Sequence, residues 1–348
     1  MSSRPRAWQR ALNALGIVEI DVMKSLSVGI VGATGLVGQE LFHVLKKRGF
    51  PVGKLRLFAS ANSAGKVLHD TELEQLRSGC FSGLDVVFFA AGSDVSKRWA
   101  PEAVSQGAFV VDNSSAFRME EGVPLVVPEI NAHTMSANTK LIANPNCSTI
   151  LALVALAPLH EAFGLRQLIA STYQAVSGSG KGGVDALSAE MRAWCDGCTL
   201  STEHYPKPIV LNVIPLVDTL LEDGSSREEW KLRVESQKIL QLPDLKVAAT
   251  CVRVPVMRAH SMALTVSFDK SFSLEEAKDC LQVAAGVCLY EQEAIPTPQD
   301  ASGVGDCIAG RLRLTDVLPN GLALWVSGDQ LLKGAALNAV QIAEKVFL

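Results

Sequence analysis

The fold is predicted by the stretch Leu26-Ser27-Val28-Gly29-Ile30-Val31-Gly32-Ala33-Thr34-Gly35-Leu36-Val37-Gly38. Residues 26–31 form a short apolar strand, and a helical pattern follows the glycines over residues 39–47. The early glycine permits a tight turn, and the later glycines let the backbone approach a pyrophosphate. Strand, glycine turn and helix in this order indicate the opening of a Rossmann unit. The spacing is GxxGxxG rather than GxGxxG, so an ordinary glycine-bearing turn is the alternative.

The segments on either side of Cys147 predict two kinds of sheet. Before it, strands alternate with helical patterns such as residues 95–106, which favours a parallel sheet with right-handed crossovers. The further strands expected there are 55–59, 85–90 and 108–112. After Cys147 the strands are longer, which indicates an α+β domain with a mixed or antiparallel sheet. The strands expected there are 167–175, 246–254, 262–268 and 323–326, with helices at 227–240 and 273–285.

This organisation predicts an α/β protein of two domains. We expect a dinucleotide-binding domain at residues 24–146 and a catalytic and dimerisation domain at 147–326. The C-terminal segment 327–348 contains an apolar-rich helix, expected at 331–347, that returns to the first domain. Residues 1–23 read as a poorly ordered extension or an upstream start. A transit peptide is the weaker alternative, because this stretch contains acidic residues and few serines.

Composition excludes several classes of partner. A length of 348 residues suits two domains, and an apolar fraction of 48% is enough for a full core. The net charge is −4 and there is no long basic run, so neither nucleic acid nor an anionic membrane is an expected partner. No apolar stretch reaches the roughly 18 residues of a membrane-spanning helix. Eight scattered cysteines without a secretory signal favour the reducing cytoplasm.

Cys147 is the candidate nucleophile. It lies in Pro145-Asn146-Cys147-Ser148-Thr149, directly before the apolar run 150–156, which reads as a buried helix. A thiol at a helix N-terminus meets the positive end of the helix dipole, which favours the thiolate. A nucleophilic thiol and a hydride carrier in one chain indicate oxidation or reduction at the acyl level. The alternative is a buried, inert cysteine.

The segment after the second expected strand bears on the cofactor. It reads Ser60-Ala61-Asn62-Ser63-Ala64-Gly65-Lys66 and contains no Asp or Glu that could hold a ribose 2′-hydroxyl. Hydroxyl, amide and lysine groups suit a 2′-phosphate better, so NADP is favoured over NAD.

Four further segments carry a resemblance to a known family. They are residues 112–118 (DNSSAFR), 174–183 (QAVSGSGKGG), 253–260 (RVPVMRAH) and 333–338 (KGAALN). Together with GATGLVG and PNCST, they make the chain from residue 24 to the C-terminus closely resemble aspartate-β-semialdehyde dehydrogenases. The resemblance implies NADPH-dependent reduction of L-aspartyl 4-phosphate to L-aspartate 4-semialdehyde with release of phosphate. This reaction feeds lysine, threonine, methionine and diaminopimelate synthesis, and the family forms homodimers or tetramers of dimers.

The resemblance implies a role for each residue around the reacting carbon. Cys147 attacks the acyl carbon and forms a thioester, and His260 is the acid/base group. Gln174 orients the substrate or the tetrahedral intermediate. Arg253 binds the α-carboxylate through its planar fork, and Glu228 meets the α-amino group. A structural histidine and an acidic residue that only complements the helix dipole are the alternatives for His260 and Glu228.

Phosphate and cofactor sites follow from the same resemblance. Arg118 and Lys231 match phosphate-binding positions, with a solvent-exposed pair of Glu228 and Lys231 as the alternative. The expected cofactor residues are Gly32, Thr34, Gly35, Leu36, Val37 and Gly38 in the turn, Ser60, Asn62 and Ser63 near the 2′-phosphate, and Ser177, Gly178 and Gln330 near the nicotinamide. Many family members have arginine in place of Asn62, and an uncharged amide weakens the case for NADP.

Other interpretations stay open at this point. Cys195 and Cys198 form a CxxC, but no second pair supplies zinc ligands, so no metal is expected. N-acetyl-γ-glutamyl-phosphate reductase is the nearest rival enzyme, and its acetylated substrate would not need the carboxylate of Glu228. A glyceraldehyde-3-phosphate dehydrogenase has a different motif around its cysteine. A non-catalytic paralogue that binds nucleotide would be expected to lose Cys147 or His260.

Overall fold

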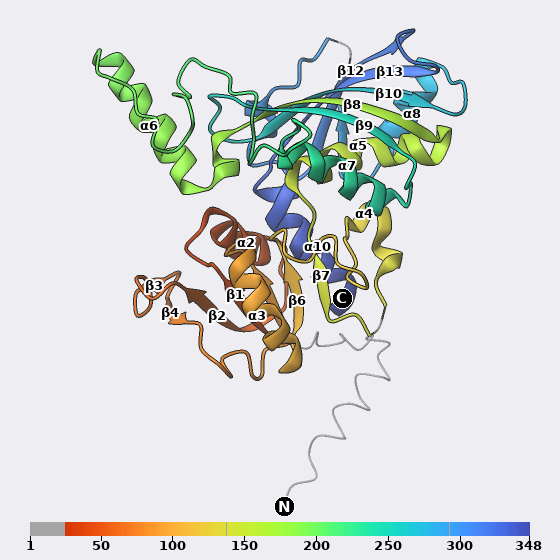
Figure 1. Cartoon of the computed structure of the whole chain (residues 1–348). Helices are drawn as coiled ribbons and strands as arrows, with labels where there is room; N and C mark the ends of the chain where they lie inside the picture. Colours follow the sequence, from red (N-terminus) through yellow and green to blue (C-terminus); the bar gives the residue numbers. More distant parts are fainter. Residues whose placement is uncertain (1–24, 137, 292) are drawn as a thin grey trace, which may run out of the picture.

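The computed structural model describes residues 25–136, 138–291 and 293–348. It shows two lobes, each built on one β-sheet (Figure 1). The chain passes from the first lobe to the second between Ala143 and Cys147, and it returns near the C-terminus. The predicted α/β class with a second α+β lobe is confirmed. The predicted extension at residues 1–23 lies outside the described residues. The domain bounds at 146/147 and 326/327 stay a prediction.

The first lobe contains a seven-stranded sheet in the order β3-β4-β2-β1-β5-β6-β7. Its strands are β1 (Leu26–Val31), β2 (Val52–Ala59), β3 (Val67–Leu68), β4 (Thr71–Gln75), β5 (Val86–Phe89), β6 (Phe109–Asp112) and β7 (Leu141–Ala143). All pairs are parallel except β3 with β4, so the predicted parallel sheet is confirmed. β1 lies between β2 and β5, which makes its carboxyl end the topological switch point where ligands bind in such sheets.

The helices of this lobe begin close to that edge. α2 (Leu36–Lys47) starts in the glycine turn after β1, and α3 (Ser93–Ser105) starts after β5. A short α4 (Pro128–Asn131) and the 3₁₀ turn η1 (Ala132–Thr134) precede β7. The N-termini of α2 and α3 therefore face the crevice at the carboxyl ends of the strands.

The second lobe contains a six-stranded sheet in the order β11-β12-β13-β10-β8-β9. Its strands are β8 (Leu165–Gln174), β9 (Lys246–Arg253), β10 (His260–Phe268), β11 (Val287–Leu289), β12 (Cys307–Thr315) and β13 (Gly321–Gly328). β8 with β9 and β11 with β12 are parallel and the other pairs are antiparallel, which confirms the predicted mixed sheet. Its helices are α5 (Cys147–Phe163), η2 (Val176–Ser179), α6 (Lys181–Cys195), α7 (Arg227–Leu240), α8 (Leu274–Gln282) and α9 (Pro298–Ala301).

α5 is the centre of the second lobe. Its own apolar side chains point to every side of the helix, and residues 148–157 are all buried. A helix that is apolar all round is stable only in a protein interior, and α5 packs between the sheet and the helices α7 and α8. The first residue of this helix is Cys147, so the core holds the candidate nucleophile in place. No helix among the described residues has the length and apolar content needed to cross a membrane.

The C-terminal segment returns to the first lobe, as predicted. Its helix is not continuous, however, because a π-helical segment η3 (Leu332–Ala336) precedes α10 (Leu337–Phe347). Val340 and Ile342 of α10 belong to the same core cluster as Ile30 of β1. Figure 1 shows the C-terminal segment running from the second lobe, at the top, into the first lobe, where α10 lies. π-Helical turns are frequent at functional sites, and this one lies against Cys147.

Candidate active site

Asn146 and Cys147 start α5 and form the floor of the site. The Asn146 side chain caps the helix, since its Oδ1 accepts hydrogen bonds from the backbone N–H groups of Ser148 at 2.9 Å and Thr149 at 3.4 Å. Cys147 is partly exposed and lines a cleft between the lobes. A Cβ added to Gly334 would lie 2.8 Å from the Cys147 Cβ, so only glycine fits there. The π-helical segment therefore packs directly against Cys147.

The resting thiol is not the thiolate that the helix end favours. Burial, followed by the carboxylate of Glu228, raises the pKa of Cys147 to about 11, although Arg118 and Arg253 act in the opposite direction. A helix terminus contributes about 0.3–1 kcal/mol, which is less than one pKa unit. Desolvation and the neighbouring carboxylate therefore outweigh the dipole, and the thiol is protonated near neutral pH.

The charge of Glu228 can be tested through this thiol. Glu228→Gln should lower the pKa of Cys147 because it removes a nearby negative charge. In the unliganded protein, we expect the rate of alkylation of Cys147 by iodoacetamide to keep rising with pH up to about pH 11. In the variant, the midpoint of this pH dependence should move to lower pH. The rate is measured by mass spectrometry of the peptide that contains Cys147. An unchanged midpoint would show that Glu228 does not act on the thiol.

Gln174 and Arg253 lie side by side at the ends of two parallel strands. They are register partners on β8 and β9, and both are buried. The Nη1 of Arg253 donates to the carbonyl of Ala175 at 2.7 Å. Within the described ranges no carboxylate pairs with Arg253, although it is only 5% exposed. A buried guanidinium without an acid partner is costly unless a ligand supplies the anion, so Arg253 suits a substrate carboxylate.

Glu228 connects the turn before Cys147 with the ends of β8 and β9. Its carboxylate accepts from Asn146 Nδ2 at 3.0 and 3.1 Å, from Gln174 Nε2 at 3.1 Å and from Lys231 Nζ at 3.3 Å. Lys231 also donates to Asp218 at 2.6 Å. Burial lowers the pKa of Lys231, but Glu228 and Asp218 outweigh it, and the net pKa is raised. Glu228 is a buried acceptor with the charge that an ammonium group needs.

His260 is the first residue of β10 and is completely buried. Its Nδ1 accepts a hydrogen bond from the backbone N–H of Ala175 at 3.0 Å, and its Nε2 has no partner among the described residues. Burial and the charge of Arg253 hold the pKa of His260 well below its usual value, so the ring is neutral. The contact at Nδ1 assigns the proton to Nε2. His260 therefore offers an N–H donor.

Gly178 lets His260 and Arg253 lie close to the backbone of η2. A Cβ at this position would lie 3.0 Å from Arg253 Nη1 and 3.0 Å from His260 Cε1. The adjacent Ser177 donates to the carbonyl of Met257 and accepts from Gln330 Nε2. Gln330 in turn accepts from the N–H of Ala259 at 2.8 Å. These contacts fix the loop that ends at His260.

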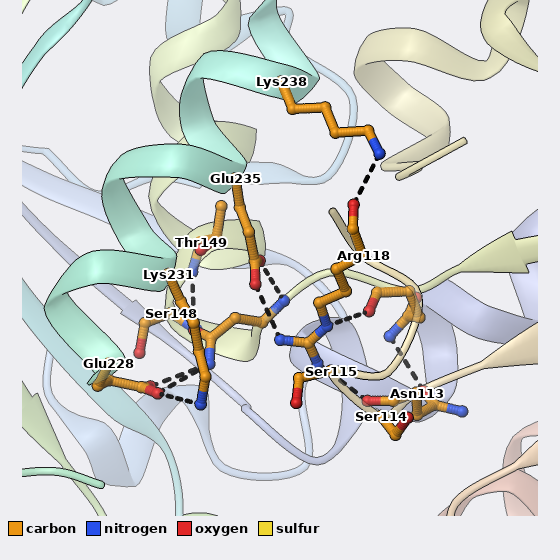
Figure 2. A network of polar contacts seen from close by, with 12 residues as sticks. Asn113, Ser114, Ser115, Arg118, Ser148, Thr149, Glu228, Lys231, Glu235 and Lys238 are labelled. Carbon is orange, nitrogen blue, oxygen red and sulfur yellow. Dashed lines mark hydrogen bonds and ion pairs between the residues drawn. The ribbon is translucent and has the colours of Figure 1, made fainter. Parts of the chain in front are cut away.

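Arg118 is held by three separate segments (Figure 2). Its Nε donates to the carbonyl of Asn144 at 3.0 Å, its Nη2 to the carbonyl of Asn113 at 2.9 Å, and its Nη1 to Glu235 at 3.0 Å. Arg118 and Lys231 line a common cavity of about 250 Å³, and Arg118 also lines the main cleft. The structure therefore brings the two predicted phosphate residues together near Cys147.

The main cleft has a volume of about 640 Å³ and reaches the glycine turn. Gly35, Leu36 and Val37 line it together with Cys147. No side chain caps the first turn of α2, so its backbone N–H groups are available to an anion. Gly32 has φ +85°, and a Cβ there would lie 2.6 Å from the carbonyl oxygen of Ala90. These features fit a dinucleotide pyrophosphate.

The remaining predicted cofactor residues divide into two groups. Ser177, Gly178 and Gln330 line the cleft on the side of the second lobe. Ser60, Asn62 and Ser63 form the turn after β2 and are not among the residues that line it. Thr34 lies in the glycine turn, whereas Gly38 lies in the first turn of α2, where it packs against the carbonyl of Gly32.

Several residues of the site were not predicted from the sequence. Asn146, Glu235 and Gly334 each contact a predicted site residue or its backbone. The sequence does contain a pattern that indicates Glu235, because Glu228, Lys231 and Glu235 follow the i, i+3, i+7 spacing of one helical face. It also contains one for Asn146, as an N-cap residue before an apolar run. It contains none for Gly334, since the closeness of this residue to Cys147 depends on the return of the C-terminal segment.

The CxxC lies away from this site. Cys195 ends α6 and Cys198 follows it, and both are exposed and free. In the part of the chain that the structure describes, no group of three or more potential metal ligands comes together. α6 projects from the second lobe (Figure 1).

Comparison with known proteins adds two family models and close relatives. Residues 27–138 match the model "Semialdehyde dehydrogenase, NAD binding domain", and residues 156–333 match "Semialdehyde dehydrogenase, dimerisation domain". An aspartate-semialdehyde dehydrogenase of Streptomyces akiyoshiensis is 47% identical, with 92% of this chain and 98% of the relative covered.

Solved structures agree with this result. Aspartate semialdehyde dehydrogenase II of Vibrio cholerae, complexed with ASA, has a TM-score of 0.89 at 38% identity, covering 93% of this chain and 98% of that one. The Candida albicans aspartate semialdehyde dehydrogenase with NADP has a TM-score of 0.73 at 26% identity, covering 93% and 98%.

Proposed function

The chain belongs to the aspartate-semialdehyde dehydrogenase family, and we propose that it converts L-aspartyl 4-phosphate to L-aspartate 4-semialdehyde with NADPH. The reaction is reversible and releases inorganic phosphate. It serves the aspartate pathway to lysine, threonine, methionine and diaminopimelate. The similarity to a Vibrio cholerae enzyme complexed with ASA supports the choice of substrate.

One observation carries this proposal. Arg253 is a buried cation without a carboxylate partner in the described ranges, and it shares the site with Glu228 and the Cys147 thiol. An amino acid supplies the carboxylate that Arg253 lacks and an ammonium for Glu228, which in the structure contacts Lys231 at 3.3 Å. Its carboxylate pairs with Arg253 through two parallel hydrogen bonds, and its ammonium pairs with Glu228. An acetylated amine carries no charge for Glu228, so the free amino acid is favoured over the acetylated substrate.

Cys147 performs the first step as a nucleophile. Its sulfur forms a bond to the acyl carbon, and the bond from that carbon to the phosphate oxygen breaks. The thiol proton leaves with the phosphate, so charge and atoms balance. The substrate ammonium offsets Glu228, which is one of the two main causes of the raised Cys147 pKa. Substrate binding thereby lowers the pKa of the thiol that must react.

His260 acts on the oxygen of the resulting thioester. NADPH, held by Gly35, Leu36 and Val37, would supply a hydride to the carbonyl carbon. The Nε2–H of His260 donates a hydrogen bond to the oxygen as it becomes negative, and Gln174 orients the reacting group. The bond to sulfur then breaks, and Cys147 regains a proton from solvent. With Nδ1 engaged by the N–H of Ala175, the ring donates at Nε2 rather than accepting there.

Arg118 and Lys231 hold the phosphate group. Arg118 keeps two N–H groups, one on each Nη, beyond those used by its protein partners. Lys231 contributes a movable point charge once it leaves Asp218. Both cations neutralise the leaving phosphate.

The cofactor we propose is NADP. The turn after β2 contains no acidic residue that would repel a 2′-phosphate, and the similar Candida albicans structure is of an enzyme with NADP. Ser60 and Asn62 are exposed at the carboxyl end of β2, next to the glycine turn after β1. The match to a dimerisation domain supports a homodimer or homotetramer, and eight free cysteines support the cytoplasm as its location.

Asn62→Arg tests the cofactor assignment. An arginine would add charge-assisted hydrogen bonds to the 2′-phosphate, so we expect the ratio of kcat/KM for NADP to that for NAD to rise about tenfold. Both values come from steady-state kinetics at fixed substrate and phosphate. An unchanged ratio would show that residue 62 does not face the 2′-phosphate.

The reaction itself is tested by reduction of NADP and of NAD with L-aspartate semialdehyde, with and without phosphate. We expect turnover only when phosphate is present. If folded protein gives no turnover with either nucleotide, the proposed function is wrong.

A further inference from the structure

Glu235 is a buried carboxylate at the site to which the reaction above gives no role. It lies on the face of α7 that also carries Glu228 and Lys231, and it is 1% exposed. Figure 2 shows its carboxylate pointing from α7 toward the guanidinium of Arg118. Burial of a charge is expensive unless it is paired and hydrogen-bonded, so its partners indicate what it does.

The two oxygens of Glu235 bind two different segments. Oε1 accepts from Arg118 Nη1 at 3.0 Å, and Oε2 accepts from the backbone N–H of Asn146 at 2.7 Å. Arg118 belongs to the loop after β6, whereas Asn146 is the residue directly before the nucleophile. One carboxylate therefore ties a phosphate-binding cation to the turn that presents Cys147.

The other contacts of Arg118 leave little freedom. The carbonyls of Asn144 and Asn113 occupy Nε and one N–H of Nη2. Because the guanidinium is planar, the contact with Glu235 fixes the direction of the two N–H groups that remain. Their direction decides how well they meet the oxygens of a phosphate.

We propose that Glu235 is a positioning residue that sets the affinity for phosphate by holding Arg118 in register with the turn at Cys147. This inference rests on the proposed function, because it assumes that Arg118 binds the phosphate group. Glu235 itself touches neither the phosphate nor the reacting carbon.

Glu235→Gln removes the negative charge of the side chain and keeps its size. A glutamine has the same size but only one acceptor oxygen, and its NH₂ end is a donor. Both partners of Glu235 are donors, so the variant loses one contact whichever way the amide faces. We expect the KM for phosphate to rise about tenfold in NADP reduction with L-aspartate semialdehyde, which corresponds to one charge-assisted hydrogen bond. The KM for L-aspartate semialdehyde and for NADP should change less than about threefold on the same reasoning.

Glu190→Gln is the matched control. Glu190 is 3% exposed, and its Oε2 accepts both hydrogen bonds, from the N–H groups of Ile209 at 2.7 Å and Val210 at 2.9 Å. The variant therefore replaces a buried carboxylate, while its single amide oxygen can keep both contacts. Both contacts join α6 to the segment that follows it. Glu190→Gln should leave the KM for phosphate unchanged. If the KM for phosphate rose equally in both variants, Glu235 would have only a structural role and the proposal would be overturned.

A double-mutant cycle shows whether Glu235 acts through Arg118. In the Arg118→Ala background, Glu235→Gln should change the KM for phosphate less than about twofold, because the cation that it positions is gone. Additive effects would overturn the proposal. Glu235→Asp keeps the charge but is one methylene too short to reach both partners, so it should also raise the KM for phosphate and serves if the glutamine variant does not fold. Failure of the proposed function would look different, because wild-type turnover would then not depend on phosphate.

Discussion

Cys147→Ala protein is expected to show no turnover while it still binds NADP. Every step of the proposed reaction passes through the bond between the Cys147 sulfur and the acyl carbon. Loss of a covalent nucleophile costs roughly 10⁴-fold or more in kcat. Binding of NADP should persist, because the glycine turn and α2 belong to the other lobe and their geometry does not depend on the thiol. The test combines the steady-state rate with a calorimetric titration of NADP.

The matched control for this variant is Cys307→Ala. Cys307 is buried on β12 and has no role in the proposed reaction. Its truncation should cost about 1–2 kcal/mol of stability through lost packing, with turnover retained. Turnover near the wild-type level in Cys147→Ala would remove the covalent mechanism, whatever the behaviour of the control.

Regular periodicity was the reason why many elements could be predicted. The helix expected at residues 227–240 matches α7, which begins with a capping box at Ser226 and Glu229. β1 also matches its prediction, because a short apolar run directly before a glycine turn is compatible with few structures other than a buried strand. In both cases the local signal and the tertiary structure agree.

Elements with interrupted patterns were not predicted. β12 contains a register shift between Gly310 and Arg313, with Arg311 at φ +54°, so its side chains do not alternate regularly. α6 begins with Lys181-Gly182-Gly183, and two glycines give a weak start to a helix. β7 has only three residues. The predicted C-terminal helix was continuous, whereas the chain forms a π-helical segment where Gly334 meets Cys147.

The chemistry of the site depended on contacts that no motif contains. The motifs named Cys147 and Glu228, but only the fold places the carboxylate close enough to raise the pKa of the thiol. The helix dipole, a local feature, predicted the opposite direction. In the same way, the motif named Arg118 but not Glu235, because the contact between them joins two distant parts of the chain.

Arg253→Lys is expected to cause the second large loss of activity, and this loss should be confined to the use of L-aspartate semialdehyde. An ammonium cannot make the two parallel hydrogen bonds that a guanidinium makes to a carboxylate. Burial also lowers the pKa of a lysine, so the substituted side chain loses part of its charge. We expect kcat/KM for L-aspartate semialdehyde to fall about 10²–10³-fold, consistent with the roughly 3–5 kcal/mol lost when one partner of a buried charge pair is removed. The KM for phosphate should change less than about threefold, since Arg118 and Lys231 are untouched.

Arg166→Lys provides the comparison for the loss of a guanidinium as such. Arg166 pairs with Asp269 on the surface, where an exposed ion pair contributes less than about 1 kcal/mol, so both kinetic parameters should stay at the wild-type level. The selectivity of Arg253→Lys is the decisive quantity, because Arg253 also contacts the carbonyl of Ala175, whose N–H binds His260. A variant that merely loosened this strand end would impair the phosphate and semialdehyde steps alike. Equal losses on both substrates would therefore assign Arg253 to the support of the loop, and a loss confined to the semialdehyde assigns it to the α-carboxylate.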